Sequence, residues 1–156
     1  MTKNFSKGFT IIELLVVVAI IAVLAAIVLV NVTGYINQGK NAAIKGNLAT
    51  VLTNGAVYYE ANGNYGTSGA ASPVTTGTNF CTNAYFTAPS NAIVAAGGSS
   101  FCSVSAIYDK WCACSTMKTT TAEVAGSTFC ADSTGYKKVT PTACATRCPA
   151  AGGCAE

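Results

Sequence analysis

Glu13 is the side chain of this sequence whose position most needs a chemical explanation. It follows Gly8-Phe9-Thr10-Ile11-Ile12, and no polar side chain occurs between Leu14 and Val30. A carboxylate one turn inside a membrane helix costs about 2.5–3.5 kcal/mol on insertion scales, so it usually has a function and a partner. A cut after Gly8 would create such a partner, the amine of Phe9. Within one chain this amine lies at the same helix end as Glu13 and competes with the N–H groups of the first turn for its carboxylate. A neighbouring copy therefore offers the better pair.

The apolar segment that carries Glu13 is long enough to cross a membrane. Together with Phe9 to Glu13, the run from Leu14 to Val30 exceeds twenty residues, close to the roughly 20 that span a bilayer as a helix. Lys3 and Lys7 precede it, and the positive-inside rule places them on the cytoplasmic side and the rest of the chain outside. A secretory signal peptide is cut after its apolar region. Here the natural cut, at Gly8, precedes it, so the mature protein would keep the helix.

One further interpretation of this segment stays open. A plain single-span anchor explains the apolar run equally well, and Glu13 would then only reach toward the membrane interface. Against this, two apolar helices slide past each other with little preference, whereas one buried charge pair has a single favourable register, as a polar residue does in a coiled coil. Glu13 therefore favours a defined stagger between packed copies of the helix.

The start of the chain carries a family resemblance. Lys7-Gly8-Phe9-Thr10-Ile11-Ile12-Glu13-Leu14-Leu15-Val16-Val17-Val18 resembles the cleavage and methylation motif of type IV pilins and pseudopilins, and the likeness in detail covers about the first quarter of the chain. It implies that a prepilin peptidase/methyltransferase cuts between Gly8 and Phe9 and methylates Phe9. It also implies that Phe9 and Glu13 act in filament assembly, the glutamate pairing with the N-terminal amine of an adjacent subunit. The implied partners are identical or related pilins, the pilus assembly machinery and, before assembly, the membrane.

Beyond the membrane segment, apolar residues continue at helical spacing. Steps of three and four predict one face of a helix that runs to about Ala61. Asn62-Gly63-Asn64 then supplies a Gly and Asn stop signal. We expect this second half of the helix to pack on the globular part of the protein, while its first half stays free. The predicted apolar face consists of Ile44, Leu48, Val51, Leu52, Gly55, Ala56 and Tyr59.

The same helix both follows and departs from the pilin pattern. The stretch from Val57 to Tyr65 resembles the end of the pilin stalk helix, with a tyrosine-bearing turn and an Asn-Gly step. Many type IV pilins carry a proline in the first half of this helix, and this chain lacks it. Gly34, Gly39 and Gly46 occur instead, each costing about 1 kcal/mol of helix stability relative to alanine. They predict either a hinge or a melted stretch near Thr33 to Gly39 in the assembled filament, or small residues that permit close helix packing.

All eight cysteines lie beyond this helix, in a region rich in Gly, Ser, Thr, Ala and Asn. Large apolar residues are few there, so disulfides, each contributing about 2–4 kcal/mol, are the expected stabilisers. An exported location permits them. The cysteine spacing does not determine the pairing. The predicted disulfide cysteines are Cys81, Cys102, Cys112, Cys114, Cys130, Cys144, Cys148 and Cys154.

Zinc binding is the alternative use of these cysteines. Cys144-x3-Cys148 has a plausible ligand spacing, but Cys112-Ala113-Cys114 is too short for one chelating knuckle and Cys154 is distant in sequence. We therefore expect no metal site. A redox Cys-x-x-Cys motif is absent from the sequence, which disfavours thiol exchange as an activity of the protein.

Short alternating segments predict a small antiparallel sheet in this region. Expected strands are Phe101 to Ile107, Lys110 to Met117 and Phe129 to Asp132, followed by a turn and a returning strand from Tyr136 to Thr140. The chain after Pro141 is expected to be loop-like. In the second strand, one face holds Trp111, Ala113, Ser115 and Met117, and the other holds Cys112 and Cys114. The predicted fold class is α+β, with a long N-terminal hydrophobic helix packed on a small, disulfide-rich antiparallel sheet, and pilin heads are similar.

The composition argues against catalysis and nucleic-acid binding. The sequence has no histidine, the commonest general base and metal ligand. Loss of Lys3 and Lys7 with the leader would leave seven cations against six anions, and the pair Lys137-Lys138, which we expect in a solvated turn, is the nearest approach to a basic patch. No calcium loop or phosphate-binding motif is present in the sequence. We expect no enzyme, no cofactor and no nucleic-acid partner.

These observations predict four segments: a removable basic leader at 1–8, a transmembrane and filament-core helix at 9–32, its amphipathic continuation at 33–61, and an extracytoplasmic head at 62–156. The resemblance implies a structural subunit of a type IV pilus-like filament, held in the cytoplasmic membrane before it reaches the cell surface. A minor pilin or pseudopilin of a secretion or DNA-uptake system is the alternative within the family. A monomeric, membrane-anchored, disulfide-stabilised binding domain is the alternative of another class.

Overall fold

A computed structural model describes residues 8–66, 79–149 and 152–154, except for the side chains of residues 30 and 31. The chain forms two compact units, 1–36 and 37–156. One helix, α1 (Ile11–Asn62), contributes residues to both. It ends one residue beyond the predicted Ala61, where Gly63 has a φ of +73° and donates its N–H to the Tyr59 carbonyl at 2.7 Å. Glycine adopts this left-handed conformation without strain, so the predicted stop signal has a structural basis.

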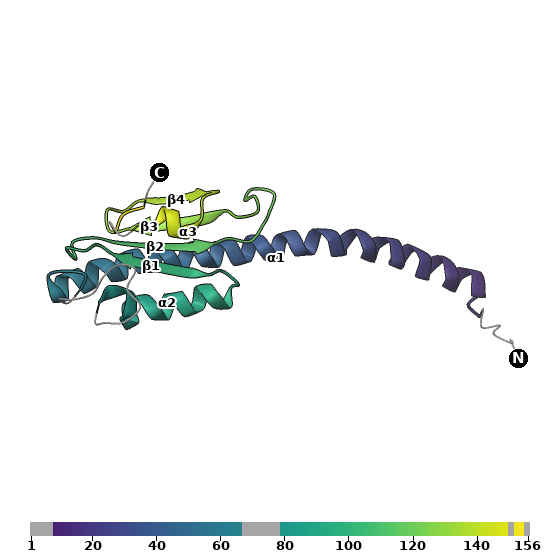
Figure 1. Cartoon of the computed structure of the whole chain (residues 1–156). Helices are drawn as coiled ribbons and strands as arrows, with labels where there is room; N and C mark the ends of the chain where they lie inside the picture. The colour runs from purple at the N-terminus through teal and green to yellow at the C-terminus, as the bar shows by residue number, and fades with distance from the viewer. Residues whose placement is uncertain (1–7, 67–78, 150–151, 155–156) are drawn as a thin grey trace, which may run out of the picture. The chain divides into compact units, whose positions relative to one another are not determined.

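The second unit is built on a four-stranded antiparallel sheet in the order β1-β2-β3-β4 (Figure 1). The strands are β1 (Ser100–Val104), β2 (Trp111–Thr116), β3 (Thr128–Asp132) and β4 (Lys137–Thr140). Each strand pairs with the next along the chain, for example Cys114 with Cys130 between β2 and β3. The sheet, the long apolar helix and the disulfides confirm the predicted α+β fold class.

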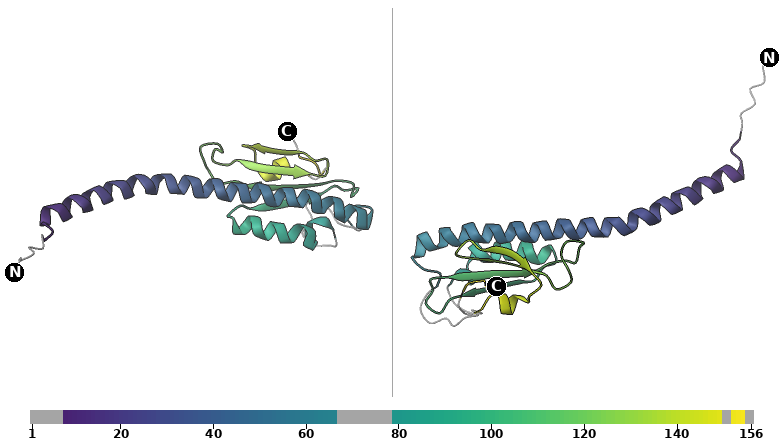
Figure 2. Two further views of the ribbon diagram at one scale, coloured as in Figure 1. Left: turned by 180° about the vertical axis from the view of Figure 1, so that it is seen from behind. Right: turned by 90° about the horizontal axis from the view of Figure 1, so that it is seen from above.

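One face of the sheet packs on helices. Both views of Figure 2 show α2 (Ala84–Ala95) beside the second part of α1. The core on this side is centred on Trp111, whose ring centroid lies 4.9 Å from that of Phe80. It includes residues from α1, α2, β2 and β3, among them Ile44, Leu48, Val51, Tyr58, Phe86, Ile93, Ala113 and Phe129.

The opposite face of the sheet holds sulfur. Cys112, Cys114, Cys130 and Cys148 form a second buried cluster, below the short helix α3 (Cys144–Arg147). The predicted division of β2 into a face with Trp111 and a face with Cys112 and Cys114 is therefore confirmed. The strand alternation that produces it is the ordinary consequence of side chains pointing to opposite sides of a strand.

Helix α2 has no counterpart in the sequence predictions. Its start is capped by Asn83, whose side chain accepts the Tyr85 N–H at 3.1 Å. Pro89 lies inside the helix and has no N–H to donate to the Tyr85 carbonyl, four residues earlier. The side chain of Asn54, on α1, donates to that carbonyl instead, at 2.6 Å. A contact between two helices thus replaces the bond that proline removes.

Three local predictions were wrong. Ala56 and Tyr59 are exposed, and Tyr58 takes the buried position because the helix face turns slightly toward the aromatic core. The segment after Pro141 contains α3, not only a loop. Lys137 and Lys138 lie in the exposed edge strand β4 and not in a turn, where charged side chains discourage pairing with other strands.

Candidate assembly site and cysteine cluster

The N-terminal end of α1 contains a reciprocal set of hydrogen bonds around Glu13. Its carboxylate oxygen Oε2 accepts the backbone N–H of Thr10 at 2.9 Å and the Thr10 hydroxyl at 2.8 Å. In return, the Glu13 N–H donates to the Thr10 hydroxyl oxygen at 3.3 Å. This is a capping box, in which Thr10 and Glu13 satisfy donors that a helix start leaves without partners.

The sequence suggested only the Phe9 amine as a partner for Glu13 within its own chain, and the structure adds another. This second partner is Thr10, three residues earlier, and sequence reasoning passed over that residue although the pattern Thr-x-x-Glu is a known signal for a helix start. Phe9 lies just before the helix and is 82% exposed. Gly8, the predicted cleavage residue, is also exposed, and the rest of the predicted leader lies outside the described residues.

Beyond this capping box, the described apolar side chains of the first part of α1, up to Thr33, are exposed. Every described residue from Gly8 to Thr33 is exposed. Leu15 is 63% exposed and Leu24 is 58% exposed, although such side chains are normally buried. By length and composition, α1 is a helix that can cross a membrane. A contiguous apolar surface of this size indicates a lipid or protein partner.

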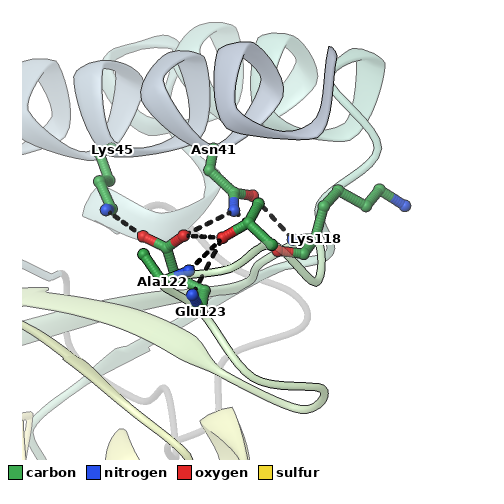
Figure 3. A network of polar contacts seen from close by, with 6 residues as sticks. Asn41, Lys45, Lys118, Ala122 and Glu123 are labelled. Atoms are coloured by element: carbon green, nitrogen blue, oxygen red, sulfur yellow. Dashed lines mark hydrogen bonds and ion pairs between the residues drawn. The ribbon is translucent and has the colours of Figure 1, made fainter. Parts of the chain in front are cut away.

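Residues 33–39, the predicted hinge, lie inside α1 in this structure. The prediction concerned the assembled state of the protein, where it stays a prediction. Within the second unit, α1 becomes fixed to the loop that follows β2. Figure 3 shows how Asn41 exchanges hydrogen bonds with the backbone of Lys118, donating to its carbonyl and accepting its N–H, both at 2.7 Å.

The same loop supplies the carboxylate of Glu123. Lys45 Nζ lies 2.7 Å from Glu123 Oε1 in an ion pair that is partly sheltered from water. The hydrogen bond from Lys45 holds the pKa of Glu123 below its usual range, and the Thr120 hydroxyl adds to this effect. These contacts fasten the loop to the helix surface, which indicates a structural role.

All eight cysteines are paired in disulfides. The pairs are Cys81–Cys102, Cys112–Cys148, Cys114–Cys144 and Cys130–Cys154. The first joins the 3-10 turn η1 (Phe80–Thr82) to β1. The other three tie the sheet to α3 and to the C-terminal segment. The C-terminal segment therefore has covalent attachments at three points on the central strands β2 and β3.

The sulfur cluster brings together cysteines that are far apart in sequence. The Sγ atoms of Cys112, Cys130 and Cys154 all lie within 4.8 Å of one another. Sequence spacing did not suggest this group, because its members come from two strands and the C-terminal segment. Three sulfurs at this separation resemble a zinc site, but each of them belongs to a disulfide in this structure, so the geometry supports the stapling role.

Comparison with known proteins bears on the N-terminal segment first. Residues 3–29 match the family described as the prokaryotic N-terminal methylation motif. Over 50 residues, the chain is 48% identical to the type IV major alpha-pilin of Moraxella bovis and 46% identical to fimbrial protein Q of the same species. Each alignment covers 32% of this chain, and the chain spans only 31% and 32% of the length of these two relatives. No solved structure matches the chain.

The matched motif contains Gly8, Phe9 and Thr10, which precede α1, and Glu13, which lies in its first turn. All four residues are exposed. The fold adds a long apolar helix and a small antiparallel sheet with four disulfides. The motif and the two relatives together show that the N-terminal segment of this chain is similar to that of type IV pilins.

Proposed function

We propose that this chain is a structural subunit of a type IV pilus-like filament, made as a prepilin in the cytoplasmic membrane. A prepilin peptidase/methyltransferase removes residues 1–8 and methylates Phe9. The observation that supports this most strongly is the coincidence of the methylation motif with the exposed, apolar first part of α1, which contains one carboxylate, that of Glu13. The residues between 9 and 32 then form the filament core, residues 33–61 continue the helix, and residues 62–156 form the head.

The capping box suggests how Glu13 can act in assembly. Lipid and neighbouring helices are similarly apolar, so moving α1 from one to the other gives little hydrophobic preference for any register. A charge pair between Glu13 and the Phe9 amine of a neighbouring copy would supply that preference. Thr10 holds the Glu13 carboxylate at the N-terminal end of the helix, where that amine would approach.

Two other functions use the same residues. A minor pilin or pseudopilin would prime or tune a filament without forming its bulk. A small head with nearly balanced charge and four disulfides suits an abundant exposed subunit somewhat better. A monomeric anchored domain would keep its leader and would not need Glu13.

Intact mass and N-terminal peptide analysis of material sheared from the cell surface tests the proposal. A filament subunit gives a dominant species that begins at methylated Phe9, with a mass lowered by two hydrogens for each of the four disulfides. An uncut chain found only in membranes would contradict the filament and leave the anchored domain. A processed chain present only in traces would indicate a minor pilin.

The charge of Glu13 is tested by Glu13→Gln, which keeps the size of the side chain and its ability to accept from Thr10. We expect this variant to be processed and inserted normally, while sheared filament falls at least about tenfold, the effect of roughly 1.4 kcal/mol. Glu60→Gln is the matched control, because Glu60 is an exposed residue of the same helix. Equal filament yield from Glu13→Gln and Glu60→Gln would contradict a role for the charge.

A further inference from the structure

Two of the four disulfides share one buried site. Cys112–Cys148 and Cys130–Cys154 both lie on the sheet face opposite α1. The Sγ atom of Cys112 is 3.3 Å from that of Cys130 and 3.6 Å from that of Cys154. Cys112 therefore touches both sulfurs of the other disulfide. The sheet register produces this contact, because Cys130 pairs with Cys114 and so lies diagonally opposite Cys112.

Access to this site is uneven. Cys112 and Cys130 are fully buried and Cys148 is 2% exposed, whereas Cys154 is only half-buried. Of the four sulfur atoms in these two disulfides, a reagent from solution therefore reaches that of Cys154 first. A thiol–disulfide exchange depends on the access of the attacking thiolate and on which sulfur it attacks. Burial thus sets an order of reaction, with Cys154 first and Cys112–Cys148 reached only from inside.

The sequence lacks a Cys-x-x-Cys motif and so did not favour thiol exchange, but the contacts between these sulfurs do not depend on that motif. We propose that this cluster is a thiol–disulfide exchange site, which accepts a small external thiolate at Cys154 and passes the exchange inward to Cys112–Cys148. In the first step, the external thiolate attacks Cys154 Sγ, forms a mixed disulfide and releases the Cys130 thiolate. In the second step, the Cys130 thiolate attacks Cys112 Sγ, 3.3 Å away, forms Cys112–Cys130 and releases the Cys148 thiolate.

A third step closes the cycle without any oxidant. The Cys148 thiolate attacks Cys154 in the mixed disulfide, forms Cys148–Cys154 and releases the external thiolate unchanged. The number of disulfides is the same before and after, so electrons and protons balance. The cluster is thereby a point where a small thiol converts one pairing of four cysteines into another, and this proposal does not depend on the filament function.

The remaining chain provides an internal reference. Cys81–Cys102 lies on the other side of the sheet, where Cys81 belongs to the aromatic core and Cys102 packs against it. Its sulfurs are separated from the cluster by the sheet itself. Cys102 is half-buried, as Cys154 is, so glutathione can also open Cys81–Cys102 directly. An exchange that runs through local contacts forms no disulfide between this pair and the cluster, whereas general unfolding allows such mixed pairs.

The test uses the full chain in detergent, treated with reduced glutathione under conditions that keep the native near-ultraviolet circular dichroism. Samples are trapped by rapid alkylation and their disulfides are mapped by mass spectrometry. We expect glutathione on Cys154 before Cys112, Cys130 or Cys148, then peptides linked through Cys112–Cys130, with no peptide that links Cys81 or Cys102 to the cluster. Free thiol that stays confined to Cys130, or peptides that link Cys81 or Cys102 to the cluster and form equally fast, would overturn the proposal.

A double variant, Cys130→Ser with Cys154→Ser, removes the first disulfide of the relay. We expect glutathione to open Cys112–Cys148 at least about tenfold more slowly in this variant, because access controls the reaction. The matched control, Cys81→Ser with Cys102→Ser, should leave that rate unchanged. If Cys112–Cys148 opens at the original rate in the first variant, the relay is wrong. The mapping of the unmodified chain decides the question if a variant fails to fold.

Discussion

The two parts of α1 have the same secondary structure and opposite surroundings. Every described residue from Gly8 to Thr33 is exposed, whereas Ile44, Leu48 and Val51 are completely buried. The later part is amphipathic and packs its apolar face on the sheet of its own chain, while the earlier part is apolar on all sides. A helix that is apolar all round needs a membrane or other helices to cover it. The comparison shows that one continuous helix has one part that its own chain covers and another part that its own chain leaves exposed.

The largest effect expected from this comparison comes from truncating one leucine in each part. Leu48→Ala leaves a cavity in the core of the second unit and should lower the free energy of unfolding by about 2–5 kcal/mol. Leu24→Ala, at a position that is 58% exposed, should leave that unfolding unchanged. Thermal unfolding in detergent, followed by the near-ultraviolet signal of the buried Trp111, measures both. Equal destabilisation by the two substitutions would contradict the conclusion that only the later part of α1 packs in the core of the second unit.

Glycines provide a second, smaller contrast. A Cβ atom at Gly55 would lie 2.5 Å from Trp111 Nε1, whereas a Cβ at Gly39 would meet nothing within 4 Å. Gly55→Ala should therefore destabilise the second unit by about 1–3 kcal/mol through overpacking. Gly39→Ala should instead increase helix stability by up to about 1 kcal/mol. Denaturant unfolding of both variants checks the signs, and a stabilising Gly55→Ala would contradict the close packing of α1 on Trp111.

The Glu123 carboxylate should make the stability of the second unit depend on pH. Its pKa is lowered in the folded protein, chiefly by the hydrogen bond from Lys45. Its contribution is therefore fully present above the ordinary value of about 4.3, and it is lost as the pH falls through the lower folded value. Glu123→Gln should cost about 1 kcal/mol at neutral pH, near the upper end for partly exposed pairs.

The free energy of unfolding, measured from pH 7 to pH 3, distinguishes the parent protein from Glu123→Gln. The difference in unfolding free energy between the parent and Glu123→Gln should shrink only below about pH 5, on the acid side of the ordinary carboxyl pKa. Glu60→Gln, at an exposed site with no ion pair among the described residues, should show no such change. A constant difference over the whole range would mean that the Glu123 charge does not stabilise the loop.

The smallest effect is expected at the start of α1. Thr10→Val keeps the shape of the side chain but removes the hydroxyl that bonds Glu13. Losing such a cap costs about 1 kcal/mol locally, so amide exchange in the first turn should accelerate roughly fivefold while unfolding of the second unit stays the same. Unchanged exchange at Glu13 and Leu14 would show that the capping box is not formed in solution.

Glycine and proline, which interrupt helices and strands, explain how much of this fold could be predicted from the sequence. The end of α1 and the turn between β3 and β4 were found because Gly63 and Gly135 mark them locally, and both have positive φ angles. Helix α2 was missed because Pro89 lies inside it, and the compensating bond comes from Asn54, distant in sequence.

Of the candidate site residues, some could be predicted from the sequence and others could not. Glu13 stood out because of its charge, while its partner Thr10 was overlooked although its spacing from Glu13 was visible in the sequence. The cysteine pairing could not be deduced, because it depends on strand register and on where the C-terminal segment lies. Local signals therefore predicted α1 and the strands but not α2 or α3, and long-range contacts decide how the elements join.

Photo-crosslinking in sheared surface material tests the central claim most directly, the claim being that copies of the chain cover the first part of α1. A photoreactive residue is placed at Val17, which is 46% exposed, or at the completely buried Leu48. The account predicts crosslinks between copies from position 17 and crosslinks only within one chain from position 48. Crosslinks from position 17 to lipid alone, with none between copies, would contradict it.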